Sequence, residues 1–511
     1  MNYEVILKRF SYAIKAFSYL ISCFFGCLAI LGWETLTGIE DIFGKQISLE
    51  QILWTLSNPV DNSDSEIFFQ IFLKLIKTIL LCTLWGIFVN FLYKDNKNES
   101  LLVRVYNLLS KYIYLIQNNR KNHTTSFISK LLLGICLCLS LAGFSSFAIN
   151  ANKRLGITDL IPVYYGSSKN DWMESYYAVP QLSDIYFKQK NNLVITLVES
   201  FDSNFSNEQT YTPKMKALYE NGKGQGIFRM VNTQGSQWTI GALVGWFFGL
   251  PLKLPGGHNS YSKKTGFLPG TLSVFDVLKE NGYKTVLIMG GDSHFSNMDS
   301  LVKGHGNFDI YDKSYWEKLG YDLKKYGGTG WGYNDNFVLS RASEIYEKLQ
   351  EYDTPFAILV ETIDTHGPLG WCPEDKRQYG DIRDAFLETD RQLAKFINRI
   401  HELKTKPMCL AVLGDHLFMG EREIFEKVER HIWNLFFEDC PKIPFSKSNQ
   451  IVNAVDIAPT ILEAAGARWN NRQFGLGYSF FSEEESLVNR LKVKGYNKLI
   501  RGYSKKYNDL L

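Results

Sequence analysis

Three long stretches near the N-terminus carry no charged residue, and they limit what this chain can fold into more than any other feature. They span residues 16–33, 78–93 and 131–152. An α-helix needs about 17–25 apolar residues to cross the hydrocarbon core of a bilayer, so the first and third stretches qualify and the second is marginal. Core helices of a soluble protein are the alternative. We expect three transmembrane helices, which anchor the chain in the membrane.

The segments that flank these stretches alternate in charge, which predicts their orientation. The segments before the first stretch and between the second and third are basic, whereas the segment between the first and second is mainly acidic. Basic segments stay in the cytoplasm, so the chain runs in, out, in, out. A cleaved signal peptide fits less well, because two more apolar stretches follow the first. We expect a multi-pass protein of the cytoplasmic (inner) membrane, with residues after Asn152 facing the periplasm or the cell exterior.

Net charge and cysteine content add little to this picture. The formal net charge of +3 is close to neutral, so the bulk composition does not point to nucleic acid as a partner. Most of the cysteines fall in the apolar stretches, where they behave as small apolar residues. Of the three that remain, Cys409 lies in an apolar run typical of a buried strand. A bridge between Cys372 and Cys440 is therefore the pairing we consider.

From Asn191 onward, short apolar runs rich in β-branched residues alternate with amphipathic helical stretches. The runs include NLVITLVES, TVLIMGG, FAILVET, MCLAVLGD and NLFFED. This alternation is typical of a mostly parallel sheet covered by helices on both faces, so the predicted fold is an α/β sandwich. The predicted organisation is a membrane anchor at 1–152, a juxtamembrane linker at 153–190 and an extracytoplasmic catalytic domain at 191–511.

Chemically useful side chains follow the predicted strands. Glu199 ends the first strand, Asp415 and His416 follow the strand MCLAVLG, and Thr239 lies at a loop-to-helix junction in GSQWTIGAL. In parallel sheets ligands bind beyond the carboxyl ends of the strands, so these groups could converge on one divalent cation. Mixed oxygen and nitrogen ligands suit Mn²⁺, Zn²⁺ or Mg²⁺. Taken one at a time, Thr239 is also a good helix N-cap, and Gly-Asp-His is also a common turn.

Several motifs together resemble the sulfatase-like branch of the alkaline-phosphatase superfamily. They are VESF, WTIGALVG, DTHGP, GDHLFMG and VDIAPTILEAAG, between Glu199 and Gly466. The segments WTIGALVGWFFGLPL, KGHGNFDIYD, GWGYNDNFVL and GLGYSFFS are most similar to the phosphoglycerol transferases of that branch. QILWTLSN, in the acidic outer loop, extends the resemblance toward the N-terminus. Lipoteichoic acid synthases and phosphoethanolamine transferases are more distant relatives of the same design.

The resemblance implies an alkaline-phosphatase-like fold and roles for individual residues. It implies Glu199, Thr239, Asp415 and His416 as ligands of one divalent metal, most consistently Mn²⁺, with Thr239 also the nucleophile. His366 corresponds to a histidine that holds the substrate phosphate or assists proton transfer.

Three further residues belong to the predicted substrate contacts. His305 of KGHG fits the phosphoglycerol transferases, although a structural role in the turn is the alternative. Trp331 and Asp335 of GWGYND are expected to line the acceptor side, and simple packing of the tryptophan is the alternative. The arginine that lipoteichoic acid synthases place near the glycerol phosphate has no counterpart in HFSNMDSLVKGHG.

The function implied by the resemblance is a two-step transfer. Thr239 attacks the phosphorus of phosphatidylglycerol and releases diacylglycerol, and a hydroxyl of an extracytoplasmic glycan then attacks the phosphoglyceryl-threonine. A phosphoethanolamine transferase, a phosphodiesterase of the same fold and an inactive envelope scaffold are the alternatives. A formylglycine sulfatase fits poorly, because Thr239-Ile-Gly-Ala-Leu lacks the Cys or Ser followed by x-Pro-x-Arg that such enzymes require.

Overall fold

The computed structural model describes residues 3–43, 47, 49–57, 65–93, 121–159, 171–203, 211–254, 266–328, 330–367, 370–420 and 429–511. These residues form two compact units. Unit 1 comprises 1–41 and 66–155, and unit 2 comprises 42–65 and 156–511. Residues 42–65 thus belong to unit 2, although they fall within the range predicted as the anchor. The basic segment 94–120, predicted to be cytoplasmic, lies outside the described residues.

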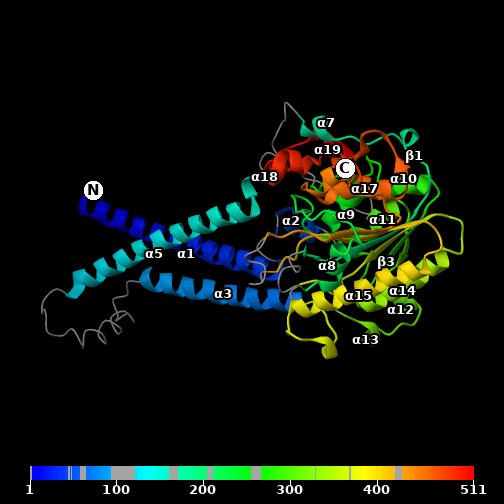
Figure 1. Ribbon diagram of the computed structural model, residues 1–511. Helices are drawn as coiled ribbons and strands as arrows, with labels where there is room; N and C mark the ends of the chain where they lie inside the picture. Colours follow the sequence, from blue (N-terminus) through cyan, green and yellow to red (C-terminus); the bar gives the residue numbers. More distant parts are fainter. Residues whose placement is uncertain are drawn as a thin grey trace. The chain divides into compact units, whose positions relative to one another are not determined.

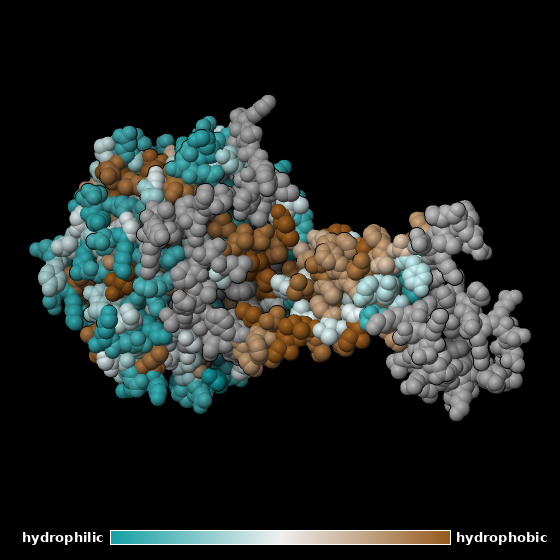
Figure 2. All heavy atoms as spheres, turned by 180° about the vertical axis from the view of Figure 1, so that it is seen from behind, coloured by the Kyte–Doolittle hydropathy of each residue, from teal (hydrophilic) through white to brown (hydrophobic). Residues whose placement is uncertain are grey.

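Unit 1 consists of three long apolar helices, α1 (Tyr3–Phe43), α3 (Ser65–Tyr93) and α5 (Lys121–Leu155). By length and composition each contains a segment that can cross a membrane, at Tyr12–Asp41, Ile71–Tyr93 and Leu131–Leu155. Large apolar side chains along these helices are exposed, among them Phe17, Ile87 and Leu139. Figure 2 shows hydrophobic surface, in brown, over much of the visible face of these helices. Such a surface suits lipid rather than water.

Among the described residues, three ion pairs join the helices of unit 1. Acidic residues of α1 pair with basic residues of α3 and α5, and the pairs are Asp41–Lys74, Glu34–Lys77 and Glu40–Arg154. Lys74 and Lys77, near the start of the apolar part of α3, thus each have an acidic partner on α1.

Unit 2 is built on a six-stranded sheet with the order β4-β3-β5-β2-β6-β7. All neighbouring strands are parallel except β7, which runs antiparallel to β6. The strands are β2 (Asn192–Val198), β3 (Lys284–Met289), β4 (Asp309–Tyr311), β5 (Phe356–Glu361), β6 (Met408–Gly414) and β7 (Asn434–Glu438). The predicted mostly parallel sheet is confirmed, and the apolar runs of the sequence form its strands.

Helices cover both faces of this sheet, as Figure 1 shows. Along β2, Leu193, Ile195 and Leu197 pack into one hydrophobic cluster, whereas Val194 and Val198 pack into the other. The first cluster includes α9 (Thr239–Phe248), α10 (Val274–Glu280), α11 (Met298–Gly304), α17 (Ile457–Ala464) and α18 (Leu487–Arg501). The second includes α8 (Pro213–Glu220), α12 (Lys313–Lys318), α14 (Asp335–Leu349) and α15 (Ile382–Leu403). Alternation of side chains along a strand produces these two cores.

Short elements complete unit 2. They are α2 (Leu49–Ser57), α7 (Trp172–Tyr176), α13 (Leu323–Tyr326), α16 (Phe445–Ser448), α19 (Lys505–Leu510), β1 (Tyr186–Phe187), β8 (Ala467–Arg468), β9 (Gln473–Phe474) and β10 (Gly477–Tyr478). β1 pairs with β8 and β9 pairs with β10, in both cases antiparallel. Because β1 lies in the predicted linker, part of that segment packs on the domain.

The disulfide differs from the pairing considered from the sequence. Cys440 is bonded to Cys409, not to Cys372, which is a free, buried cysteine. The reason is strand pairing: Cys409 of β6 lies opposite Glu438 of β7, so Cys440 follows the partner strand closely, and the two Cα atoms are 4.7 Å apart. That separation lies within the range that a disulfide requires.

Candidate active site

Glu199, Asp415 and His416 lie together at the carboxyl ends of neighbouring strands. Glu199 follows β2, and Asp415 and His416 follow β6, which pairs with β2 in parallel register. One potential ligand atom from each of the three lies within 4.8 Å of the others. All three are buried, with exposed fractions of 1%, 0% and 1%. The structure thus brings together three of the four residues expected to bind metal, and we call them the carboxylate cluster.

Ser200 donates hydrogen bonds to both carboxylates of this cluster. Its backbone N–H donates to Asp415 Oδ1 at 2.8 Å, and its hydroxyl donates to Glu199 Oε1 at 2.6 Å. It adopts a left-handed conformation with φ of 52°, which is unfavourable for a residue with a side chain. Such strain persists only where surrounding contacts over-determine it, as they do here. The sequence carries no signal for this conformation.

Thr239, the fourth expected ligand, meets the cluster through Glu199. It is the first residue of α9, and its hydroxyl donates to Glu199 Oε2 at 3.3 Å. The side chain of Trp238, the N-cap residue, makes no capping hydrogen bond, so the first amides of α9 have no side-chain acceptor there. Amides at a helix N-terminus attract a phosphate. The threonine hydroxyl therefore lies where an anion and a carboxylate can both reach it.

The donor set of the carboxylate cluster fits a divalent cation. His416 Nδ1 donates to the Leu417 carbonyl at 2.9 Å, so Nε2 is the ring nitrogen that faces Glu199 Oε1 at 3.6 Å and Asp415 Oδ2 at 3.3 Å. Among the described residues, His416 Nε2 and Asp415 Oδ2 have no hydrogen-bond partner. A backbone acceptor on the second ring nitrogen is typical of metal-binding histidines.

The electrostatics of the cluster also favour a bound cation. Burial, together with the negative charge of Glu199, raises the pKa of Asp415 to about 7, although His416 opposes that shift. Buried carboxylates that lie this close together are costly unless a positive charge joins them. The structure thus fits the predicted divalent metal.

Glu361 is a neighbouring carboxylate that we did not predict as a site residue. It ends β5, beside β2, and its Oε2 has no hydrogen-bond partner among the described residues. Burial, then the charges of Glu199, Asp415 and Asp335, raise its pKa to about 8. The signal in the sequence was a glutamate that ends an otherwise apolar, fully buried strand.

The rings of His366 and Trp331 are in contact. Their ring centroids are 4.9 Å apart, and Phe295 lies 4.9 Å from Trp331 on edge-to-face geometry. All three are half-buried. His366 Nδ1 donates to the Gly367 carbonyl at 2.9 Å, so Nε2 remains the nitrogen able to accept a proton. We call Phe295, Trp331 and His366 the aromatic patch.

Asp335 lies beneath this patch and not at its surface. Its exposed fraction is 0%, and its Oδ1 accepts the N–H groups of Ile363 at 2.7 Å and Asp364 at 3.1 Å. In return, the Asp335 N–H donates to Asp364 Oδ2 at 2.9 Å. This reciprocal pair ties the start of α14 to the loop that carries His366. The predicted substrate contact of Asp335 stays a prediction, and its observed contacts position His366.

His305 lies away from the carboxylate cluster, in contacts of its own. Nδ1 is 2.7 Å from Asp276 Oδ2 and Nε2 is 2.5 Å from the Phe267 carbonyl. Because both ring nitrogens face acceptors, the observed arrangement suits the structural role that we weighed as the alternative. Asp276 also closes the capping box of α10 with Ser273, so His305 braces the start of that helix.

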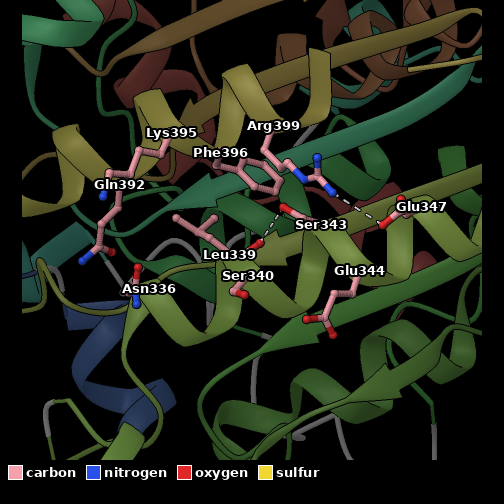
Figure 3. Close-up of a pocket in the computed structure, with 10 residues that line it drawn as sticks. All are labelled: Asn336, Leu339, Ser340, Ser343, Glu344, Glu347, Gln392, Lys395, Phe396 and Arg399. Atoms are coloured by element: carbon pink, nitrogen blue, oxygen red, sulfur yellow. Dashed lines mark hydrogen bonds and ion pairs between the residues drawn. The ribbon is translucent and has the colours of Figure 1, made fainter. Parts of the chain in front are cut away.

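A separate hollow of about 280 Å³ lies between α14 and α15 (Figure 3). Leu339, Ser343 and Phe396 point toward it, and Glu347 and Arg399 form an ion pair at its edge. None of the predicted site residues lines it.

Comparisons with known proteins find relatives of this chain. Phosphoglycerol transferase I of Xanthomonas axonopodis pv. citri (strain 306) is 27% identical over 374 residues, which cover 70% of this chain and 50% of that protein. Phosphoglycerol transferase I of Shigella flexneri is 26% identical over 353 residues, which cover 66% and 45%. This chain spans about half the length of these curated relatives.

A solved structure, the lipoteichoic acid synthase LtaP from Listeria monocytogenes, is 21% identical, covers 60% of this chain and 79% of that one, and has a TM-score of 0.45. The sequence model of the sulfatase family matches residues 191–467, the range that holds the sheet, the carboxylate cluster and Thr239. Because that match spans more than half of the 511 residues, this chain belongs to the sulfatase family.

Proposed function

We propose that this protein transfers phosphoglycerol from phosphatidylglycerol to an extracytoplasmic glycan through a threonine-linked intermediate. The observation that carries the proposal is Thr239, a hydroxyl at a helix N-terminus that donates to one member of a buried carboxylate cluster. The names of the relatives support the phosphoglycerol group, and membership of the sulfatase family supports chemistry on an ester of an oxyanion.

In the first step, Thr239 Oγ1 attacks the phosphorus of the lipid. Its hydroxyl proton passes toward Glu199 Oε2, the acceptor at 3.3 Å. The bond between phosphorus and the diacylglycerol oxygen breaks, and diacylglycerol leaves with a proton. In the second step, a sugar hydroxyl loses its proton and attacks the same phosphorus. The bond between phosphorus and Thr239 Oγ1 breaks, and Oγ1 regains a proton as phosphoglyceryl glycan leaves.

Glu199, Thr239, Asp415 and His416 would hold one divalent cation, and Mn²⁺ is the ion that we propose, with Zn²⁺ and Mg²⁺ as alternatives. When bound, the cation lowers the pKa of the threonine hydroxyl and screens the charge of the phosphodiester. The amides at the start of α9 orient the phosphate oxygens, as helix N-termini do.

His366 would exchange protons with the oxygen of the leaving diacylglycerol and with the hydroxyl of the attacking sugar. With Nδ1 donating to Gly367, its Nε2 is available to accept a proton or, once protonated, to donate one to the diacylglycerol oxygen. Trp331 packs against this ring and would border the acceptor side of the pocket. These roles rest on the resemblance and on the contact between the two rings.

The donor lipid and the three apolar helices support a location at the cytoplasmic membrane, with unit 2 outside the cytoplasm. A reporter fused after Asn152, or at the C-terminus, should be active only outside the cytoplasm. A reporter fused near Asn118 should be active only inside. An active cytoplasmic reporter at Leu511 would overturn the extracytoplasmic location.

The decisive experiment separates the two steps. Purified protein incubated with labelled phosphatidylglycerol alone, and quenched briefly, should carry a phosphoglyceryl adduct on the peptide around Thr239. Thr239→Ala should show neither adduct nor diacylglycerol release. Thr239→Ser is the matched control, because its hydroxyl can occupy the same position and should keep part of both.

The alternatives give different outcomes in the same experiment. An ethanolamine-bearing adduct, formed when phosphatidylethanolamine is offered, would identify a phosphoethanolamine transferase. Rapid loss of the adduct to water despite added glycan would identify a phosphodiesterase. Full transfer by Thr239→Ala would exclude the threonine intermediate, and no turnover of any lipid by the intact protein would favour the envelope scaffold.

A further inference from the structure

The short helix α2 (Leu49–Ser57) is built into unit 2 although the chain places it between the apolar helices α1 and α3. Trp54 has an exposed fraction of 1%, and its ring lies 5.9 Å from that of Phe267. Trp54 belongs to the same hydrophobic cluster as Trp238 and Leu417. Those two residues directly precede Thr239 and directly follow His416. The helix therefore shares a core with both loops of the candidate active site.

Glu50 of α2 contacts the loop that leads into Thr239. Its Oε2 accepts from Gln234 Nε2 at 2.6 Å. Gln234 has further partners: its side-chain oxygen accepts from Arg501 Nε at 3.2 Å, and its backbone N–H donates to Asn497 Oδ1 at 2.9 Å. A buried amide with this many partners has one permitted position, and a hydrogen bond to a carboxylate is among the stronger ones. Glu50 thus helps to determine where this loop begins.

The backbone of that loop has little conformational freedom after Gln234. Gly235 has φ of +80°, and a Cβ atom there would lie 2.6 Å from the Leu252 carbonyl oxygen. The segment between Gln234 and Thr239 is therefore confined on one side by Leu252 and on the other by the contacts of Gln234. A displacement of Gln234 has to be transmitted to Thr239, because the intervening chain is short and packed.

Gln51 of α2 contacts the other loop. Its Nε2 lies 3.4 Å from Met419 Sδ, three residues after His416. The two loops are also joined directly, because the Leu417 N–H donates to Asn232 Oδ1 at 3.3 Å. Adjacent residues of one helix, Glu50 and Gln51, therefore reach the loops of the proposed nucleophile and of the proposed metal ligands.

We propose that α2 is a positioning element of the active site, through which a segment outside the sulfatase-family region sets the geometry of Thr239 and His416. Glu50, Gln51 and Trp54 are positioning residues, since they touch the loops and not the reacting atoms. The catalytic part of this proposal rests on the transfer proposed above, whereas the ordering of the two loops does not. Residues 191–511 without α2 would lack these contacts.

The first test measures loop order without any substrate. Amide hydrogen exchange would be followed in the full chain in lipid nanodiscs. Glu50→Ala should raise exchange at 232–239, and Gln51→Ala should raise it at 415–420, with β2 and β5 unchanged. Thr55→Ala is the matched control on the same helix, because that hydroxyl donates only to the Gln51 carbonyl of its own helix among the described contacts. Wild-type exchange in both loops of Glu50→Ala and Gln51→Ala would overturn the proposal.

The second test asks whether this order matters for catalysis. Diacylglycerol release should show kcat lowered about 10- to 100-fold in Glu50→Ala, the range that a misplaced reacting group produces. KM and bound metal should stay near the wild-type values, and Glu50→Gln, which keeps an acceptor oxygen, should recover part of kcat. A role confined to stability would lower the amount of folded protein without changing kcat, and that result would contradict the proposal.

A double-mutant cycle tests the route through Gln234. If Glu50 acts by holding Gln234, Glu50→Ala should lower kcat little further in a protein that already carries Gln234→Ala. The losses of kcat in the two single variants should therefore not add in the double variant. Additive losses would overturn this route. If the intact protein turns over no phosphatidylglycerol, the proposed function fails, and hydrogen exchange still decides whether α2 orders the loops. Should Glu50→Ala lose exchange protection in β2 and β5 as well, Glu50→Gln and Gln51→Ala provide the readout instead.

Discussion

The carboxylate cluster and the aromatic patch lie in loops at the same carboxyl-end edge of one sheet, yet they are built in opposite ways. The cluster of Glu199, Asp415 and His416 is closed to solvent, charged, and contains polar atoms without hydrogen-bond partners among the described residues. The patch of Phe295, Trp331 and His366 is half-buried and consists of rings. The first arrangement suits bond cleavage in any phosphoester, whereas the second suits recognition of a particular substrate.

This contrast predicts that changes in the cluster abolish the reaction and that changes in the patch alter its rate and preference. The largest effect is expected for Asp415→Ala, which should remove both bound metal and transfer while the fold is retained. Metal content by mass spectrometry, together with labelled diacylglycerol release, measures both. Asp353→Ala, at a fully exposed aspartate, is the control. Full metal occupancy in Asp415→Ala would take that residue out of the site.

A smaller effect is expected for His366→Ala in the aromatic patch. Turnover should fall by roughly 10²–10⁴-fold if the ring transfers protons. Metal content should be unchanged, because His366 is not among the proposed ligands. His401→Ala, at an exposed histidine paired with Glu438, should behave as wild type. Wild-type rates in His366→Ala would instead leave that residue with a structural role.

Trp331→Ala should have a smaller effect that appears as altered preference. Loss of an aromatic contact should change KM, or the preference between the two lipids, by a factor of roughly 2 to 10. The change should raise KM or shift the choice between phosphatidylglycerol and phosphatidylethanolamine, as measured by competition between the two labelled lipids. Trp331→Phe, which keeps an aromatic ring beside His366, should retain most of the preference. A uniform drop in kcat for both lipids would mean that the patch does not select the donor.

The smallest effect concerns Glu361, next to the cluster, and it is an effect on stability. In the metal-free protein its folded-state pKa of about 8 exceeds the ordinary 4.5, so the folded state holds the proton more tightly than the unfolded state. Its favourable contribution is present below pH 4.5 and is lost as the pH rises toward about 8. Glu361→Gln should therefore flatten the decline of the melting temperature across this interval in chelator-treated protein. Glu351→Gln, at an exposed position, is the control, and an identical decline in both variants would contradict the prediction.

The elements of unit 2 were predictable because their signals are local. An apolar run such as MCLAVLG forms β6, and an amphipathic stretch such as LAKFINRIHELK lies in α15, since burial on two faces or on one leaves its period in the sequence. The three apolar helices were predictable for the same reason. The expected position of Glu199, Asp415 and His416 at strand ends was local information as well.

Whether those residues meet was not local information. Glu199 and Asp415 are far apart in the chain, and they approach because β2 and β6 are neighbours in the sheet order. The pattern of apolar residues in β2 or in β6 does not indicate which strand lies beside it. From the sequence, only the resemblance to a family indicated that these residues meet, whereas in the structure the order of the strands brings them together.

The features that the sequence predicted poorly also depend on contacts between residues distant in the chain. The pairing of Cys440 with Cys409 follows from the antiparallel register of β6 and β7. The left-handed conformation of Ser200 goes with its hydrogen bonds to Glu199 and to Asp415, which is distant in the chain. The sequence by itself determined which segments are apolar, which are helical and which side chains have useful chemistry. Only the tertiary structure decided which of them meet, because strand order, register and the packing of α2 arise from contacts between residues distant in the chain.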